Sequence, residues 1–132
     1  MDESLSACYN FIMQKYKKAI GAFGERLAKE FLIRRGYEVL AANVRISKLE
    51  LDIVARKDGR LIFVEVKTRL ASNIGPAEDA LKSSQIKDLK RAMSAYCRIN
   101  KKSLESSRLD FIAIDLKPKS SSAKIKHFQD IF

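Results

Sequence analysis

Three carboxylates and one lysine occupy alternate positions of two neighbouring apolar segments: Glu50 and Asp52 in the first, Glu65 and Lys67 in the second. Because alternate residues of a β-strand share a face, each pair would project from one side of its strand. An Asp-Gly pair at positions 58–59, between the two segments, predicts a tight hairpin turn. That turn would set Asp52 directly opposite Glu65, with Cβ atoms roughly 4.5–5.5 Å apart. Glu50 would face Lys67 in the same way.

The expected Asp52–Glu65 pair is the part of this pattern that indicates chemistry. Two carboxylates about 4 Å apart repel each other by about 4 kcal/mol at an effective dielectric constant of 20. The pair therefore needs a counter-charge, which Lys67 supplies in part and a divalent cation with oxygen ligands would complete. Mg²⁺ suits carboxylates better than Zn²⁺ does. The opposite faces of both strands are apolar, which predicts central strands and a partly enclosed site; these residues are Leu49, Leu51, Ile53, Ile62, Val64 and Val66.

A solvated sheet face with cross-strand ion pairs is the alternative interpretation of the same residues. Glu50 opposite Lys67 would be an ordinary ion pair of this kind. Asp52 opposite Glu65 would not, because both side chains carry a negative charge. A metal site predicts that divalent metal changes the stability of the protein, whereas a solvated sheet face predicts no such change.

Composition excludes several other kinds of catalytic site. His127 is the single histidine, so Ser-His-Asp and Cys-His catalysis and histidine-rich zinc sites lack their residues, and His127 is expected to be a surface or packing residue. Cys8 and Cys97 are far apart without CxxC spacing, which predicts two free thiols. The acidic start at residues 1–3 and the lack of an 18-residue apolar run predict a cytoplasmic protein with no membrane partner.

The charge balance favours a polyanionic partner. The 132-residue chain has 26 Lys and Arg residues and 16 Asp and Glu residues, a net charge of +10. In a domain of this size such an excess is typical of nucleic-acid binding, and a generically basic soluble protein is the alternative. Four basic residues are the predicted contacts to nucleic acid. They are Arg69, which follows Lys67 on the same strand face, and Lys87, Lys90 and Arg91 on one expected helix.

Hydrophobic spacing predicts one α/β domain with the element order αβββαββ and a mixed central sheet flanked by helices. The first helix is expected over residues 6–35, with a break near Gly21 and Gly24 and a stop at Gly36. Its buried stripe would comprise Ile20, Phe23, Leu27 and Phe31. The remaining elements are expected as strands at 37–42, 49–56, 61–68, 109–116 and 125–128, a loop with Asn73, Gly75 and Pro76, and a second helix from 77 or 83 to 98.

The spacing Asp52…Glu65-Val66-Lys67 resembles the signature of the PD-(D/E)XK nucleases, D-x(n)-[DE]-x-K on adjacent strands. More closely, the chain resembles the YraN-like bacterial family, although Leu49 stands where that family usually has glycine. The resemblance implies a restriction-endonuclease-like domain over residues 19–132, preceded by a helical extension over residues 1–18. The matching segments are Gly21-Ala22-Phe23-Gly24-Glu25, Asn43-Val44-Arg45, residues 50–55, residues 63–69, Arg108-Leu109-Asp110 and Phe132.

This resemblance implies hydrolysis of DNA phosphodiester bonds that depends on Mg²⁺ or Mn²⁺. Asp52, Glu65 and the Val66 carbonyl would bind the metal. Lys67 would orient or help deprotonate the attacking water and stabilise the transition state. Branched DNA and the intermediates of repair or recombination are candidate substrates, and a homodimer is a candidate assembly.

Three further residues are candidates for the same site. Glu25 shares a helix face that tilts toward the sheet, and the resemblance implies that it would be a further metal ligand, because related nucleases place an acid of the first helix at the metal through water. An ordinary glutamate that favours the helix dipole is the alternative. Glu50 and Gln85 would support the site, although Gln85 also fits an ordinary surface glutamine. The rival function is a non-catalytic basic module that binds nucleic acid or acts as a scaffold. Basic charge supports both functions, whereas phosphate binding alone has no use for the carboxylates.

Overall fold

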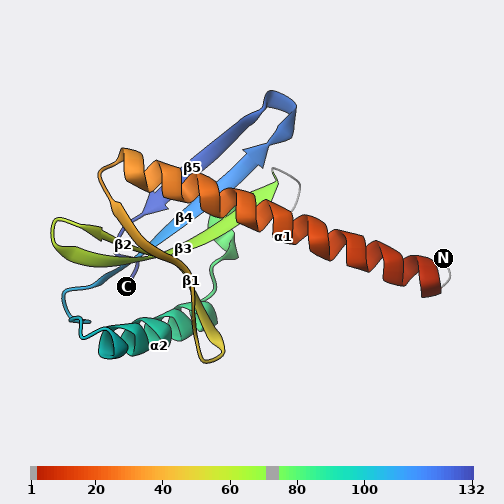
Figure 1. Ribbon diagram of the computed structural model, residues 1–132. Coiled ribbons are helices and arrows are strands. Elements are labelled where there is room, and N and C mark those ends of the chain that lie inside the picture. Colours follow the sequence, from red (N-terminus) through yellow and green to blue (C-terminus); the bar gives the residue numbers. More distant parts are fainter. Residues whose placement is uncertain (1–2, 71–74) are drawn as a thin grey trace.

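A five-stranded mixed sheet with one helix on each face forms the body of the protein in a computed structural model, which describes residues 3–70 and 75–132 (Figure 1). The element order αβββαββ is as predicted. The expected loop lies partly outside the described residues, since Asn73 falls there. The elements are α1 (Glu3–Arg34), β1 (Glu38–Ile46), β2 (Leu49–Lys57), β3 (Arg60–Leu70), a 3₁₀ turn (Ala77–Ala80), α2 (Ser83–Ile99), β4 (Arg108–Lys117), a second 3₁₀ turn (Pro118–Ser120) and β5 (Ser122–Phe128).

The strands lie in the order β1-β2-β3-β4-β5, and β3 and β4 form the one parallel pair of this sheet. A parallel pair needs a crossover, and α2 supplies it. The β2–β3 register runs from Lys57 opposite Arg60 to Ile53 opposite Val64. Both residues of the turn at positions 58–59 have positive φ, 53° and 74°, as a two-residue turn of type I′ requires. The predicted turn and its register are confirmed over these pairs.

Helix α1 covers one face of the sheet. Its buried residues Ala28 and Leu32 pack on Ile53 and Val64, together with other apolar residues of β3 and β4. Gly24 is also buried, and the helix backbone approaches Thr68 of β3 closely there. Leu27 and Phe31 of the predicted stripe pack against this core, whereas Phe23 is 44% exposed.

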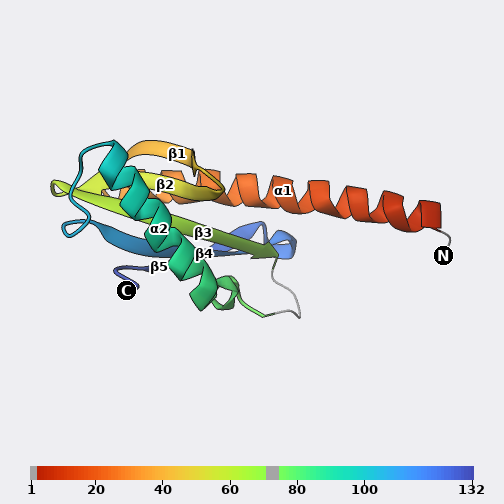
Figure 2. The ribbon, with the colours of Figure 1, turned by 90° about the horizontal axis from the view of Figure 1, so that it is seen from below.

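Helix α2 covers the opposite face of the sheet (Figure 2). On that face Leu89 and Met93 pack on Val54 and Phe63. Leu51 belongs to this second core, which corrects its predicted place beside Ile53 on the α1 side. The described β2–β3 ladder stops at Ile53, so the predicted register with β3 does not extend to Leu51. Beyond that point β2 is paired only with β1 and follows the twist of that hairpin.

α1 runs without interruption from Glu3 to Arg34, so the predicted break near its two glycines is wrong. The first half of the helix projects beyond the sheet (Figure 1), and the expected boundary at residue 18 lies inside α1. Tyr9, Phe11 and Tyr16 are exposed on this projecting half. Glycine costs only about 1 kcal/mol inside a helix, and the packing of the second half on β3 favours one continuous helix.

The two glycines of α1 are expected to respond oppositely to the same substitution. A Cβ at Gly24 would overlap Thr68 Oγ1, whereas a Cβ at Gly21 would meet nothing within 4 Å. Gly24→Ala should therefore lower the free energy of unfolding by about 1–3 kcal/mol through overpacking. Gly21→Ala should raise it by about 0.5–1 kcal/mol through helix propensity. Denaturant titration of both variants measures this, and equal shifts would contradict the close approach.

Candidate functional site

β2 and β3 separate at the position of the predicted acidic residues. The last described pair between them is Ile53 with Val64, whereas β2 stays paired with β1 and β3 with β4. We call this opening the fork; it comprises residues 49–52 of β2 and 65–69 of β3. Asp52 is the first residue of β2 beyond the ladder, and its Oδ2 accepts a 2.9 Å hydrogen bond from the Val66 N–H. The side chain thus replaces a missing ladder bond and is held in place by it.

The carboxyl groups of Asp52 and Glu65 meet at the base of the fork, as the hairpin register predicts. Burial, a hydrogen bond with Asp52 and the negative charge of Asp52 together raise the pKa of Glu65 to about 9. The positive charge of Lys67 and the Val66 N–H act in the opposite direction but are weaker. Without a bound cation, the ionised form of Glu65 is therefore disfavoured.

Glu25 brings a third carboxylate to the same region from α1. Burial and the negative charge of Asp52 raise the pKa of Glu25, while a hydrogen bond from the Asn43 side chain and the charge of Lys29 oppose the rise. The expected tilt of Glu25 toward the sheet is thus observed. Asn43, on β1, was not among the predicted site residues. Its positive φ of 53° is unusual within a strand.

A cleft of about 190 Å³ between the fork and α2 is lined by Glu50, Glu65 and Gln85, three of the predicted site residues. Gln85 has a structural role as well, because its Oε1 accepts a 3.1 Å hydrogen bond from the Lys82 N–H at the start of α2. Asp88 also lines the cleft and was missed in the sequence. Its position one turn after Gln85 on the same helix is the signal that places the two together.

The predicted basic residues lie in three places. Lys67 is close enough to Glu65 to lower its pKa. Arg69 lines a different hollow, of about 400 Å³, against the projecting half of α1. Lys87, Lys90 and Arg91 are exposed on α2. The Lys90 ammonium lies 4.2 Å from the centre of the Phe132 ring.

The carboxylates of the fork are oxygen donors of the kind that Mg²⁺ and Mn²⁺ prefer. Within residues 3–70 and 75–132, no group of three or more His, Cys, Asp or Glu side chains is arranged as a metal cage. A magnesium ion does not need one, since it keeps several waters and is commonly held by one or two carboxylates. Zinc would need a fuller set of nitrogen or sulfur ligands. The donor set therefore fits Mg²⁺ or Mn²⁺ and disfavours Zn²⁺.

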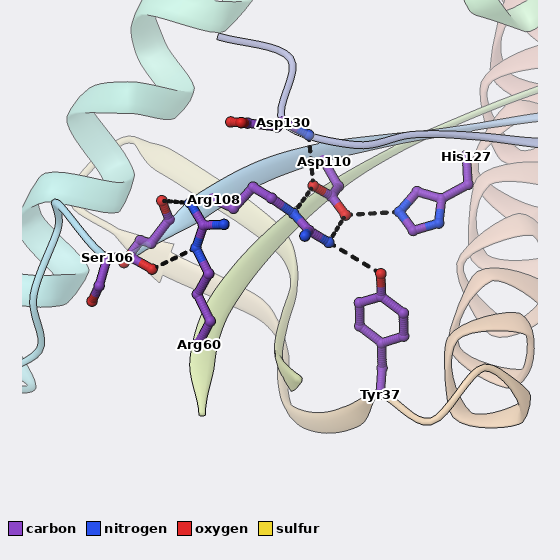
Figure 3. Close-up of polar contacts among 8 residues, drawn as sticks. Tyr37, Arg60, Ser106, Arg108, Asp110, His127 and Asp130 are labelled. Carbon is purple, nitrogen blue, oxygen red and sulfur yellow. Dashed lines mark hydrogen bonds and ion pairs between the residues drawn. The ribbon is translucent and has the colours of Figure 1, made fainter. Parts of the chain in front are cut away.

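A second polar cluster lies on the α1 side of the sheet, around the fully buried Asp110, whose strand position pairs with Val64 (Figure 3). Arg108 binds its carboxylate through Nε at 2.7 Å and Nη2 at 2.9 Å, and the Asp130 N–H donates at 3.0 Å. His127 Nε2 donates at 2.8 Å, and its side chain is only 8% exposed. His127 is thus a packing residue. Arg108 and Asp110 are two residues apart on β4, so the sequence places both on one strand face. It gives no such signal for the other members of the cluster.

Comparison with known proteins assigns the chain to a family. The sequence model described as "Uncharacterised protein family UPF0102" matches residues 24–114. The chain belongs to the UPF0102 family. The UPF0102 protein FP2501 of Flavobacterium psychrophilum is 41% identical over 113 residues, which cover 86% of this chain and 92% of the relative. The UPF0102 protein CPE1705 of Clostridium perfringens is 34% identical over 120 residues, 91% of this chain and 98% of the relative.

The UPF0102 match spans all the predicted residues of the fork and cleft, from Glu25 to Gln85, and it includes Arg108 and Asp110. It begins after the projecting half of α1. Cys8 and Cys97 are free thiols, as expected. No helix in the described part of this UPF0102 protein is long and apolar enough to cross a membrane.

Proposed function

We propose that this UPF0102 protein is a divalent-metal-dependent nuclease that hydrolyses phosphodiester bonds of DNA. The observation that carries the proposal is the meeting of the Asp52 and Glu65 carboxyls at the base of the fork, with Lys67 beside them. A half-buried pair of neighbouring acids is costly to keep in a basic protein that only binds phosphate. The pair becomes useful once a cation occupies the fork.

Asp52, Glu65 and the Val66 carbonyl would hold Mg²⁺ or Mn²⁺. The Val66 N–H points toward Asp52 on β2, and a strand residue directs its N–H and C=O to the same neighbour, so this carbonyl also faces the fork. When bound, the cation would act as a Lewis acid toward a phosphoryl oxygen and would lower the pKa of water. Glu25, which is hydrogen-bonded to the Asn43 side chain, would be a further acidic ligand, contributed by α1.

The chain's own residues then have separate roles. The hydrogen bond from Val66 fixes the Asp52 carboxylate before substrate arrives, which avoids reorganisation during the reaction. The Lys67 ammonium would orient the attacking water and stabilise negative charge that develops on the phosphate. Glu50 and Gln85 shape the cleft. Arg69, Lys87, Lys90 and Arg91 would contact backbone phosphates, in keeping with the net charge of +10.

The direct test is cleavage of linear, supercoiled and branched DNA with Mg²⁺, Mn²⁺, Ca²⁺ or EDTA. Cleavage with Mg²⁺ or Mn²⁺ but not with EDTA is the expected result, and comparison of the three DNA forms identifies the preferred substrate. Binding of DNA without cleavage under any of these conditions would instead support the non-catalytic module.

Asp52→Asn is expected to change stability in opposite directions with and without metal. In EDTA the variant should be at least as stable as wild type, because it removes the negative charge of Asp52 that disfavours ionisation of Glu65. The amide oxygen of asparagine can still accept the hydrogen bond from the Val66 N–H. The raised pKa of Glu65 makes wild type lose stability as pH rises from about 4.5 toward about 9, and this loss should be smaller in the variant.

With Mn²⁺ at about ten times its Kd, wild type should gain about 1.4 kcal/mol and the Asp52→Asn variant little. Thermal melts of both proteins in EDTA and in Mn²⁺ make the comparison. Parallel shifts of the two melting temperatures on adding metal would show that the fork is not a metal site.

A further inference from the structure

A hollow of about 360 Å³ lies at the end of the sheet where β2 turns into β3, away from the fork. Ile62 forms part of its wall. The polar residues around it are Tyr37, Lys57, Asp58, Arg60, Arg108 and Gln129. Three cations and one carboxylate therefore share a single concave surface.

Lys57 and Arg60 are directly opposite each other across the β2–β3 ladder. Like charges in this arrangement destabilise a sheet unless a counter-charge lies nearby. Within residues 3–70 and 75–132, neither residue takes part in an ion pair. Asp58, the carboxylate of the lining, is exposed in the turn itself.

Both cations are nevertheless held in defined positions. Lys57 Nζ donates a 2.7 Å hydrogen bond to the Arg35 carbonyl and lies 4.5 Å from the centre of the Tyr37 ring. Arg60 Nε donates a 2.7 Å hydrogen bond to the Ser106 carbonyl (Figure 3). These partners are neutral, so the two side chains are oriented while their charges stay uncompensated.

Arg108 differs, because Asp110 neutralises it through two hydrogen bonds. Arg108 Nη2 also donates to the Tyr37 hydroxyl at 3.1 Å (Figure 3). The hydroxyl oxygen is the acceptor in that bond, which leaves its own proton free to donate to a ligand. The hollow thus presents an ammonium, a guanidinium and a hydroxyl donor.

We propose that this hollow binds a phosphate group, held by Lys57 and Arg60 with the Tyr37 hydroxyl as a further donor. A phosphate offers several acceptor oxygens, which match the paired N–H donors of an arginine guanidinium. Its negative charge also relieves the repulsion between Lys57 and Arg60. Chloride would supply the charge without the several acceptors. The volume also leaves room for a group attached to the phosphate.

The site is separate from the fork. Arg60 precedes Glu65 by five residues of β3, roughly 17 Å along an extended strand. Arg60 also shares the α1 side of the sheet with Ile62, whereas the cleft at the fork faces α2. The bound phosphate is therefore not the one to be hydrolysed. It comes either from the backbone of a nucleic acid, in which case the inference rests on the proposed function, or from a free phosphate compound.

The first arm of the test compares melting temperatures in inorganic phosphate and in chloride at equal ionic strength, without divalent metal. Wild type should be stabilised by phosphate, and Lys57→Gln and Arg60→Gln should lose this shift. Lys102→Gln, an equal loss of charge at an exposed residue of the α2–β4 connection, should keep it. Circular dichroism in chloride confirms that each variant is folded, and Lys57→Gln takes the place of Arg60→Gln in both arms if the latter is not.

The second arm measures the Kd for a DNA duplex by fluorescence anisotropy in EDTA. If the phosphate belongs to nucleic acid, Arg60→Gln should raise the Kd about tenfold more than Lys102→Gln does. If it belongs to a free compound, the Kd should change equally in both variants while the phosphate-induced shift is lost in Arg60→Gln alone. Equal behaviour of Arg60→Gln and Lys102→Gln in both arms would overturn the inference. Because no cleavage is measured, an inactive protein would not affect this result.

Discussion

Lys67→Ala is expected to lower the rate of DNA cleavage by at least about a hundredfold while leaving the affinity for DNA nearly unchanged. Lys67 is one of 26 basic residues, so its loss alters the overall electrostatic attraction to DNA very little. It is nevertheless close enough to Glu65 to lower the pKa of that carboxyl. In the proposed reaction a cation in this position would act mainly in the transition state, so its removal should reduce kcat rather than binding. Single-turnover cleavage with Mn²⁺ and anisotropy in EDTA measure the two quantities.

Lys102→Ala is the matched control, because Lys102 is exposed in the connection between α2 and β4. It removes the same charge and should keep cleavage within about twofold, as expected for an exposed residue far from the chemistry. Cleavage by Lys67→Ala at the rate of the control would contradict the role assigned to Lys67. An equal loss of DNA affinity and of cleavage would instead make Lys67 a binding residue.

The meeting of Asp52 and Glu65 could be predicted because it depends on local geometry alone. A two-residue Asp-Gly turn fixes the register of both strands, and strand alternation then fixes the face. No long-range contact enters this argument. The observed pairing keeps this register from the turn to the pair Ile53–Val64, and Asp52 and Glu65 are the next residues along the two strands.

The separation of β2 from β3 at the fork could not be predicted, because it depends on partners elsewhere in the sheet. β2 continues with β1 and β3 with β4, and these outer ladders determine where the inner one ends. Leu51 consequently faces α2 instead of α1. The continuity of α1 has a similar origin, since Gly24 is required by its contact with Thr68, 44 residues later, and not by a helix break.

The cluster around Asp110 could not be predicted from local residue spacing either. Its carboxylate has partners on β4, in the segment after β5 and on β5 itself, and the antiparallel pairing of Ile112 with His127 brings them together. The spacing of Arg108 and Asp110 shows only that they share a strand face. A lone histidine near the end of a chain carries no signal that it will be buried against a carboxylate.

Asp110→Asn is expected to lower the free energy of unfolding by about 3–5 kcal/mol, the usual cost of removing one partner from a buried ion pair. Four hydrogen bonds converge on Asp110: two from Arg108, one from His127 and one from the Asp130 N–H. All four groups are donors, so the NH₂ group of asparagine would face donors with no acceptor, and Arg108 would lose its counter-charge. Thermal melts should show a fall of at least about 10 °C.

Stability measurements at low pH distinguish this electrostatic loss from a simple packing defect. Burial alone would raise the pKa of Asp110, but hydrogen bonds from His127, Arg108 and the Asp130 N–H outweigh it and lower the pKa below 3.8. A lowered pKa contributes stability that is complete above about pH 4 and is lost as pH falls through the folded-state value. The difference between wild type and Asp110→Asn should therefore shrink below pH 4.

Asp58→Asn is the matched control for this series, because it makes the same chemical change at an exposed turn residue whose positive φ suits asparagine. It should alter stability by no more than about 0.5 kcal/mol at any pH. A constant gap between wild type and Asp110→Asn from pH 7 to pH 3 would mean that the cost comes from shape and not from charge. The shrinking gap, with Asp58→Asn unchanged, would identify the Asp110 carboxylate as the charge that keeps Arg108 and His127 in place between β4 and β5.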